Sequence, residues 1–231
     1  MSELRTNRII PRDGLTSGTG IGGGIIQVKS VTKTDYFDTQ STSLVDVPGL
    51  AVTITPTRSD SKILVMTTMN AGSDDANFVY IQLLRDSTHI FRGDAAGNRP
   101  RRSAMYYTEN NEGKNNTVSF THMDEPATTS SVTYKIQIQC ATAGNSYVNI
   151  SHRDTDQSTN DARLASSITV MEVSGTHMDS PATTSSITYK MQVGTPYGSS
   201  YDLRVNFQGD DSNESWVGRT ASTITVMEVS A

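Results

Sequence analysis

A glycine-rich stretch near the N-terminus has the spacing that binds dinucleotides in one large class of enzymes. In GLTSGTGIGGG, the residues Gly18, Gly20 and Gly23 form the pattern G-x-G-x-x-G. A dinucleotide site needs a strand before the first glycine and a helix after the third, because the helix N-terminus binds the pyrophosphate. Here Pro11 interrupts the preceding segment, and the β-branched segment IIQVKSV that follows predicts a strand. The glycines therefore do not predict a nucleotide site, and no cofactor is expected.

An acidic stretch, DTDQSTND at residues 154–161, has the alternating oxygen atoms of a calcium-binding loop. Such a loop needs glycine at its sixth position and a bidentate glutamate at its twelfth. The sequence has Thr159 and Ala165 at these positions. It therefore predicts an exposed hairpin tip, with a weak cation site as the alternative.

His122 and His177 occupy equivalent places in an internal repeat, each two residues before an aspartate. This equivalence favours a structural role, such as a side-chain hydrogen bond that closes the turn before Pro126, over metal ligation. The single cysteine, Cys140, has no partner for an intrachain disulfide and lies in the strand-like run YKIQIQCA. We interpret it as a small buried hydrophobic residue rather than a nucleophile or a ligand.

No motif supports catalysis. The sequence has no nucleophile elbow and no H-E-x-x-H, and no pair of carboxylates stands at a recognisable spacing. We predict a protein that is not an enzyme and that holds no metal.

Two groups of side chains are candidates for contact with a receptor or partner. The segment FRGDAAGNRPRRS, residues 91–103, concentrates arginines that an acidic protein does not need for solubility. They predict a basic patch for an anionic glycan, a phosphate or a partner surface, with an ordinary charged loop as the alternative. Aromatic residues near the C-terminus predict a flat surface on which sugars stack, with a place in the core as the alternative. The candidates are Arg92, Arg99, Arg101 and Arg102, and Tyr197, Tyr201 and Trp216.

The composition of the 231 residues limits the classes of partner. The net charge of −5 gives no general attraction to nucleic acid, so no nucleic-acid partner is expected. No stretch has the apolar length of a membrane span or of a secretory signal, so no membrane insertion is expected. The lone cysteine and the absent signal predict a protein made in a reducing cytoplasm.

Short alternating runs bounded by Gly, Pro, Asp, Asn and Ser recur along the chain, and helical spacing is nearly absent. Nine strands are predicted, without intervening helices. This pattern predicts an all-β fold, an antiparallel jelly-roll sandwich. The predicted strands are 25–31, 43–56 (broken at Pro48), 62–71, 77–86, 104–109, 116–123, 131–140, 146–151 and 166–174.

The C-terminal part of the sandwich is duplicated. THMDEPATTSSVTYKIQI (121–138) returns as THMDSPATTSSITYKMQV (176–193) with 14 of 18 residues identical, and ASSITVMEVS (165–174) returns as ASTITVMEVS (221–230). The intervening segments differ, and nothing after residue 175 resembles residues 25–116. We predict a sandwich at 25–174 and a small β subdomain at 175–231, whose exposed sheet edges favour a homo-oligomer.

The segment SELRTNRIIPRDGLTSGTGIGGGIIQV resembles the N-terminal segment of virion structural proteins of marine bacteriophages, especially those that infect cyanobacteria. The blocks THMDEPATTSSVTYKIQI and SSITVMEVS are similar to strand motifs in the same phage fibre and appendage proteins. The resemblance implies a trimeric jelly-roll module, similar in build to the heads of C1q and tumour necrosis factor, on an extended N-terminal arm. The partial second copy departs from that pattern.

The arm itself has too little apolar surface to fold alone, so we expect residues 1–24 to become ordered against a partner. Its glycines predict a hinge between the arm and the sandwich. The anchoring residues are Leu4, Arg5, Asn7, Arg8, Ile9, Ile10, Pro11 and Arg12, and the hinge residues are Gly18, Gly20, Gly22, Gly23 and Gly24.

These features together predict a non-enzymatic phage virion protein, assembled in the bacterial cytoplasm. It would be a trimeric fibre or appendage that docks to a capsid, neck or tail component and contacts host surface glycans. The alternative is a capsid decoration or connector protein with a purely structural role. A glycan-cleaving depolymerase is disfavoured by the chain's small size and its lack of a carboxylate pair.

Overall fold

The computed structural model describes residues 25–74, 77–108, 115–142, 144–151, 154, 156, 161–173 and 221–222. Over these residues the protein is all-β, and no helix in them is long and apolar enough to cross a membrane. The nine predicted strands are confirmed, and two three-residue strands, β2 and β6, were not predicted. The strands are β1 (Ile25–Lys33), β2 (Phe37–Thr39), β3 (Val45–Ile54), β4 (Lys62–Ser73), β5 (Asn77–Arg85), β6 (Thr88–Ile90), β7 (Ala104–Thr108), β8 (Asn116–Asp124), β9 (Val132–Cys140), β10 (Ser146–Val148) and β11 (Ser166–Val173).

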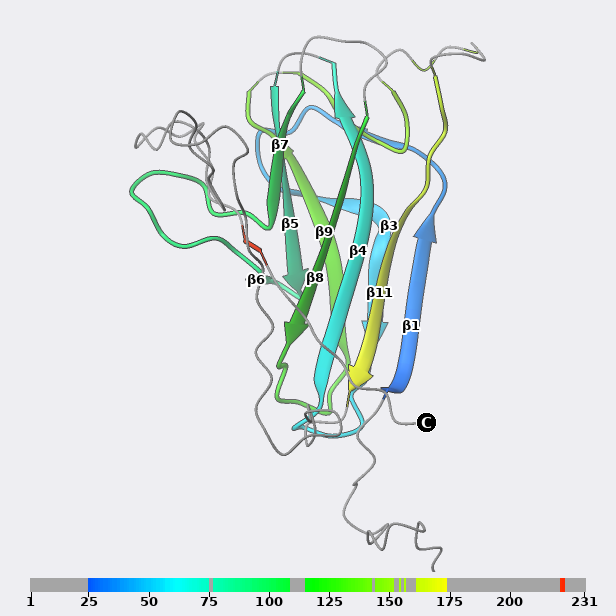
Figure 1. Cartoon of the computed structure of the whole chain (residues 1–231), viewed down its shortest axis with the longest axis vertical. Helices are drawn as coiled ribbons and strands as arrows, with labels where there is room; N and C mark the ends of the chain where they lie inside the picture. The colour runs from blue at the N-terminus through cyan, green and yellow to red at the C-terminus, as the bar shows by residue number, and fades with distance from the viewer. Residues whose placement is uncertain are drawn as a thin grey trace, which may run out of the picture.

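Two antiparallel sheets pack face to face (Figure 1). Sheet A has the order β1, β11, β4, β8, and β2 and β10 extend the lines of β1 and β11. Sheet B has the order β3, β9, β5, β7, with β6 on the same edge of β5 as β7. The first and last strands are neighbours, and most connections cross from one sheet to the other. This is the strand order of a jelly roll, and the predicted fold class is confirmed.

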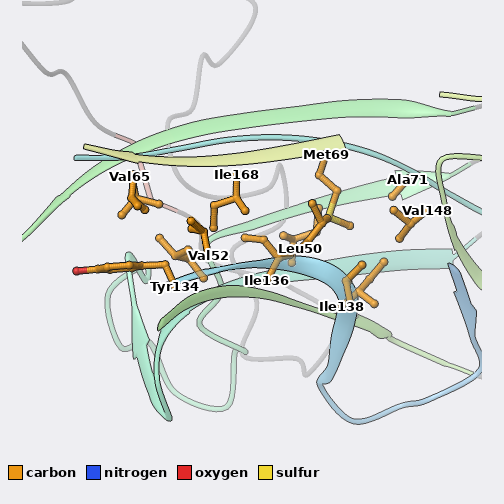
Figure 2. Packing of buried hydrophobic residues seen from close by; sticks show 14 of the residues in the cluster. Leu50, Val52, Val65, Met69, Ala71, Tyr134, Ile136, Ile138, Val148 and Ile168 are labelled. Atoms are coloured by element: carbon orange, nitrogen blue, oxygen red, sulfur yellow. The ribbon is translucent and has the colours of Figure 1, made fainter. Parts of the chain in front are cut away.

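The core lies between the sheets and follows from the period-2 pattern of the strands. β9 alternates buried and partly exposed residues along its whole length, and Tyr134, Ile136 and Ile138 point inward. They meet Leu50 from β3 and Ile168 from β11 (Figure 2). Because successive side chains point to opposite faces of a strand, one apolar set is enough to fix which face of each sheet is buried.

Pro48 lies in a bulge of β3 rather than at a break between two strands. The register of β3 against β9 shifts between Asp46 and Ala51, and Gly49 has a φ of 80°. The bulge lets both Val47 and Leu50 be buried, although they are three residues apart. It also removes Pro48 from the ladder, where its missing N–H would leave a carbonyl without a donor.

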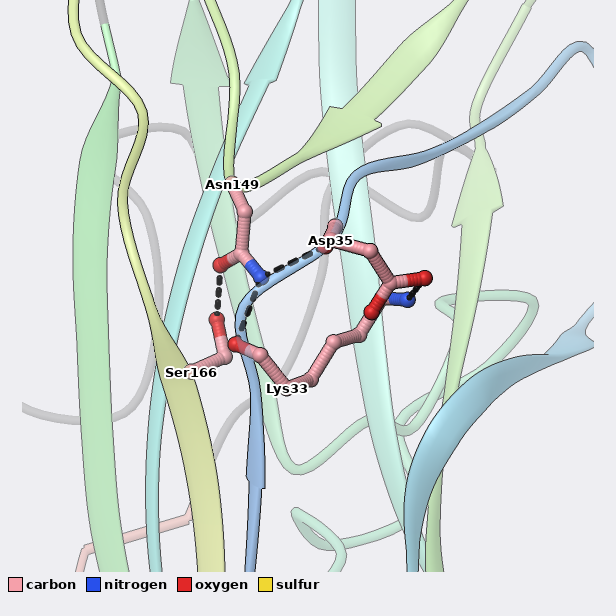
Figure 3. Close-up of polar contacts among 4 residues, drawn as sticks. All are labelled: Lys33, Asp35, Asn149 and Ser166. Carbon is pink, nitrogen blue, oxygen red and sulfur yellow. Dashed lines mark hydrogen bonds and ion pairs between the residues drawn. The ribbon is translucent and has the colours of Figure 1, made fainter.

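Asn149 holds together two strand breaks that lie side by side in sheet A (Figure 3). Its side-chain amide donates to the backbone carbonyls of Lys33 (2.9 Å) and Asp35 (3.0 Å), where β1 gives way to β2. Its side-chain oxygen accepts from the Ser166 hydroxyl (2.6 Å), where β11 begins. Asn149 is fully buried and has a φ of 66°, a conformation that asparagine adopts more readily than other non-glycine residues.

Candidate functional site

A folded-back segment covers the outward-facing side chains of β5 in sheet B. Tyr80, Gln82 and Leu84 point away from the core, since they alternate with core residues of β5, yet each is at most 3% exposed. β6 pairs with the edge of β5, and residues that follow it contact these side chains. The Gln82 amide donates to the carbonyl of Ile90 (2.8 Å), and the Ser103 hydroxyl accepts from the backbone N–H of Leu83 (2.9 Å).

The loop at residues 91–103 projects from the side of the sandwich between β6 and β7, where it is drawn in green (Figure 1). Its two ends are joined, because Gly93 N–H donates to the carbonyl of Arg102 (3.4 Å) and Arg101 Nε donates to the carbonyl of Gly93 (2.6 Å). Phe91 packs on Phe120 of β8, with ring centroids 5.2 Å apart. These contacts fix the base of a loop that sequence alone predicts only as charged.

Arg92, Arg101 and Arg102 with His89 form a basic cluster at the base of this loop. Arg102 lies 5.4 Å above the ring centroid of Tyr80 and donates to the Gln139 side chain (2.8 Å). Burial and the neighbouring Arg101 lower the pKa of Arg92. Burial also lowers the pKa of Arg102 and, together with Arg92 and Arg102, that of His89. The cations are therefore held close enough to repel one another.

The basic cluster has no carboxylate partner within the part of the chain that the structure describes. Other arginines do have one: Arg58 pairs with Asp60, and Arg163 with Asp154, each at 2.8 Å. Arg92, Arg101 and Arg102 form no such pair there. Like charges at short range cost free energy unless an anion compensates them.

Two buried hydrogen-bond donors lie at the same place. The Tyr80 hydroxyl and the Arg102 Nε are both buried, and neither has a hydrogen-bond partner among the described residues. Tyr80 is only 3% exposed, and burial raises its pKa, so the hydroxyl keeps its proton. A buried donor without an acceptor costs about 1–3 kcal/mol. Within the described part of the chain, the site thus has arginines without carboxylate partners beside two buried donors without acceptors, and its accessible arginines have the chemistry of an anion-binding surface.

The arginines predicted from sequence are thus partly gathered in one place. Arg99 lies farther along the loop, after Gly97, and its Nε donates to the carbonyl of Ala96 (2.9 Å). His89 and Tyr80 were not predicted as part of the site. They reach it from β6 and β5, and only the pairing of these strands, which depends on contacts across the sheet, brings them there.

The acidic loop and the histidine have structural contacts. Asp154 pairs with Arg163 (2.8 Å), and Asp161 accepts from the Ser151 hydroxyl (2.7 Å). His122 packs against Phe91, with ring centroids 5.3 Å apart, and makes no hydrogen bond to another described residue. Among the residues described, no group of three metal-binding side chains occurs.

The turn-closing hydrogen bond expected of His122 is absent from the described contacts, and its neighbour makes the polar contacts instead. Asp124 accepts from Tyr134 Oη (2.7 Å) and from Arg85 Nη1 (2.8 Å). Cys140 is fully buried, as predicted, and burial raises the pKa of its thiol.

Several predicted residues lie outside the described part of the chain. They are the anchor at Leu4–Arg12, the hinge at Gly18–Gly24, and Tyr197, Tyr201 and Trp216. The sequence GNSY at 144–147 returns as GSSY at 198–201, so Tyr201 corresponds to Tyr147. Tyr147 in the described copy is 9% exposed.

The outer face of sheet A is a second surface of interest, because its side chains carry no charge between the ends of the strands. Ser30 and Thr169 pair across β1 and β11 through their hydroxyls (2.8 Å), and Met66 and Met171 lie among them. Interface cores are likewise depleted of charge. The uncharged face consists of Val28, Ser30, Thr32, Ser167, Thr169, Met171, Leu64, Met66, Thr68, Asn70, Thr117, Ser119, Thr121 and Met123.

Comparison with known proteins gives no family. No protein-family model and no curated protein matches the chain. A subviral particle of infectious bursal disease virus VP2 is 12% identical over 64% of this chain and 33% of that chain, with a TM-score of 0.36. The structure of the Gx strain of that virus is 10% identical over 66% of this chain and 33% of that chain, with a TM-score of 0.36. The structure of T=1 particles derived from the virus is 10% identical over 74% of this chain and 44% of that chain, with a TM-score of 0.34. The chain spans less than half of these capsid proteins, and TM-scores this low support no argument about function.

Proposed function

We propose that this chain is a non-enzymatic structural protein of a bacteriophage particle. It forms a trimeric fibre or appendage, docked through residues 1–24 to a capsid, neck or tail component. The basic cluster contacts anionic polysaccharide of the host surface. The virion role rests on the sequence resemblance of the N-terminal segment and of the strand motifs at 121–138 and 166–174.

The observation that carries the glycan contact is the basic cluster, whose arginines have no carboxylate partner among the described residues. Arg102 is anchored by Tyr80 and Gln139, and Arg101 by the Gly93 carbonyl. These two cations therefore have a fixed geometry before a ligand arrives, while Arg92 is exposed beside them. A preorganised site loses less side-chain entropy on binding. Carboxylates and sulfates of surface polysaccharides can accept charge-assisted hydrogen bonds from the accessible guanidinium groups of Arg92 and Arg101. Three copies on one appendage would multiply such weak contacts through avidity.

Replacing Arg92 and Arg101 with glutamine is expected to weaken binding to dextran sulfate by about tenfold or more, because each arginine can form a charge-assisted hydrogen bond. Glutamine retains a donor for the Gly93 carbonyl that Arg101 contacts. The measurement is titration calorimetry at low salt, with uncharged dextran as a ligand control.

The matched control is the pair Arg58→Gln and Arg163→Gln, which removes the same charge from arginines that are ion-paired. Equal loss in both double variants would mean that net charge alone sets the affinity, and the proposed site would be wrong. If the protein is instead a decoration or connector protein, particles carrying the Arg92 and Arg101 variants will adsorb to host cells normally.

The subunit contact is assigned to the uncharged face of sheet A, packed against further copies of this chain. Replacing Thr169 with arginine places a charge at the centre of this face and is expected to convert the oligomer to a monomer, measured by sedimentation velocity. The control is Thr53→Arg on the outer face of sheet B, where Thr53 pairs with Thr133 through hydroxyls at 2.8 Å, as Thr169 does with Ser30. Dissociation by both variants, or by Thr53→Arg alone, would contradict the assignment.

A further inference from the structure

The chain carries one N-terminal half of the sandwich and two versions of the C-terminal half. Residues 25–120 supply β1 to β7 and half of β8, and nothing after residue 175 resembles residues 25–116. The strands β9 and β11 have a second version in the sequence, within residues 176–193 and 221–230. β9 lies between β3 and β5, and β11 lies between β1 and β4, so each fills a central place in its sheet.

The second version keeps the apolar residues that face the core. The inward positions compared are those of β9 from Val132 to Ile138 and those of β11 from Ile168 to Val170. At each of them the second version has either the same residue or another apolar residue. Exchanges of this size are the kind that cores tolerate best. The corresponding pairs are Val132 and Ile187, Tyr134 and Tyr189, Ile136 and Met191, Ile138 and Val193, Ile168 and Ile224, and Val170 and Val226.

Buried polar residues give a stronger argument, because their partners occur only once in the chain. Asp124 accepts hydrogen bonds from Tyr134 and from Arg85 of β5. The second version keeps both the aspartate and the tyrosine, as Asp179 and Tyr189. It contains no second β5 and therefore no second Arg85.

Glu172 of β11 shows the same relation. It is fully buried and accepts from the Gln27 side chain (2.6 Å) and from the backbone N–H of Thr57 (2.7 Å). Both partners belong to the N-terminal half. The second version keeps this glutamate as Glu228. A buried carboxylate without such partners would destabilise the fold.

We propose that residues 176–231 can take the place of residues 121–174, which supply the end of β8 together with β9 and β11, against residues 25–120 of the same chain. One N-terminal half is thus completed by either of two interchangeable C-terminal halves. The exchange replaces the connection at 140–164 with the unlike sequence at 194–220, so the same sandwich presents a different surface at that end. This inference does not depend on the proposed function.

One contact favours the first version. Asn149 follows two residues after Tyr147, whereas Leu203 stands two residues after the corresponding Tyr201. A leucine there cannot donate to the carbonyls of Lys33 and Asp35 as Asn149 does. We therefore expect the sandwich closed by the first version to be the more stable one, and it is the one that the structure describes.

The test disables each version in the full-length chain. Ile136→Asp with Ile168→Asp places charges at inward positions of the first version, and Met191→Asp with Ile224→Asp does the same in the second. Each pair alone is expected to leave cooperative unfolding, with the midpoint lowered by about 10 °C for the first pair. All four substitutions together are expected to abolish folding. An unfolded chain after the first pair alone would overturn the proposal.

A cross-link identifies which version closes the sandwich. Thr68 of β4 faces Ser167 of β11, and Thr223 is the counterpart of Ser167. With Cys140→Thr removing the native thiol, Thr68→Cys and Thr223→Cys are expected to form an intrachain disulfide in the chain whose first version is disabled. Peptide mapping by mass spectrometry detects it. A folded chain without this disulfide, or with the disulfide between two chains, would overturn the proposal.

Discussion

Replacing Asn149 with alanine is expected to lower the free energy of unfolding by roughly 4 kcal/mol. The substitution leaves the carbonyls of Lys33 and Asp35 and the hydroxyl of Ser166 without the partner that each now has, and buried groups of this kind cost about 1–3 kcal/mol apiece. The φ of 66° adds about 1 kcal/mol, because alanine disfavours that conformation. Urea unfolding followed by circular dichroism measures the loss.

Asn149→Asp separates the hydrogen bonds from the backbone conformation. Aspartate tolerates the positive φ and keeps an acceptor for Ser166, but a buried carboxylate would face the carbonyls of Lys33 and Asp35. Its pKa in the folded protein would rise above its unfolded value, so the variant should regain stability relative to wild type as the pH falls from 7 to about 4. A pH-independent difference, or a loss under about 1 kcal/mol in Asn149→Ala, would contradict this role.

Replacing Asp124 with alanine is expected to cost about 3–5 kcal/mol, because it breaks a buried ion pair and leaves its partners uncompensated. The Arg85 and Asp124 side chains are 24% and 8% exposed, and Nη1 lies 2.8 Å from Oδ2. Burial and the hydrogen bond to Asp124 raise the pKa of Tyr134, so its hydroxyl is a donor at neutral pH. Thermal unfolding monitored by calorimetry measures the change.

The compensating variant is the triple replacement Arg85→Met, Asp124→Leu and Tyr134→Phe. Apolar replacement of a whole buried ion pair is often neutral or stabilising, so we expect the triple variant to recover most of the stability that Asp124→Ala loses. If the triple variant is as unstable as Asp124→Ala, the cost comes from lost packing and not from the uncompensated charges.

The alternation of apolar and polar residues was enough to predict the sandwich. Strands such as β9 alternate without interruption, and apart from β10 the strand boundaries differ from the prediction by at most two residues. The three-residue strands β2 and β6 show no period and were missed, whereas β10 was predicted only as part of a longer run, 146–151. Pro48 was predicted as a break, and only the register between β3 and β9 shows that the chain bulges and continues.

The candidate site could be predicted only as far as it is local in sequence. The arginines of residues 91–103 are close together in the chain, and three of them do gather. Tyr80 and His89 join them through pairing across sheet B. Asn149 is an ordinary turn residue by type, and its role arises because two strand breaks meet beside it, which no local pattern encodes.

The pairing of β1 with β11 has a consequence for the order of synthesis. Ile25 of β1 has its partner at Val173, so β1 cannot pair until almost the whole sandwich has left the ribosome. During that time Ile26 and Val28 remain on an unpaired edge, and such long-range closure is slow. β11 leaves the ribosome before residues 221–230 do. The nascent chain therefore meets β11 well before residues 221–230 are made, and for the proposed exchange the timing of translation adds a kinetic preference for the first version.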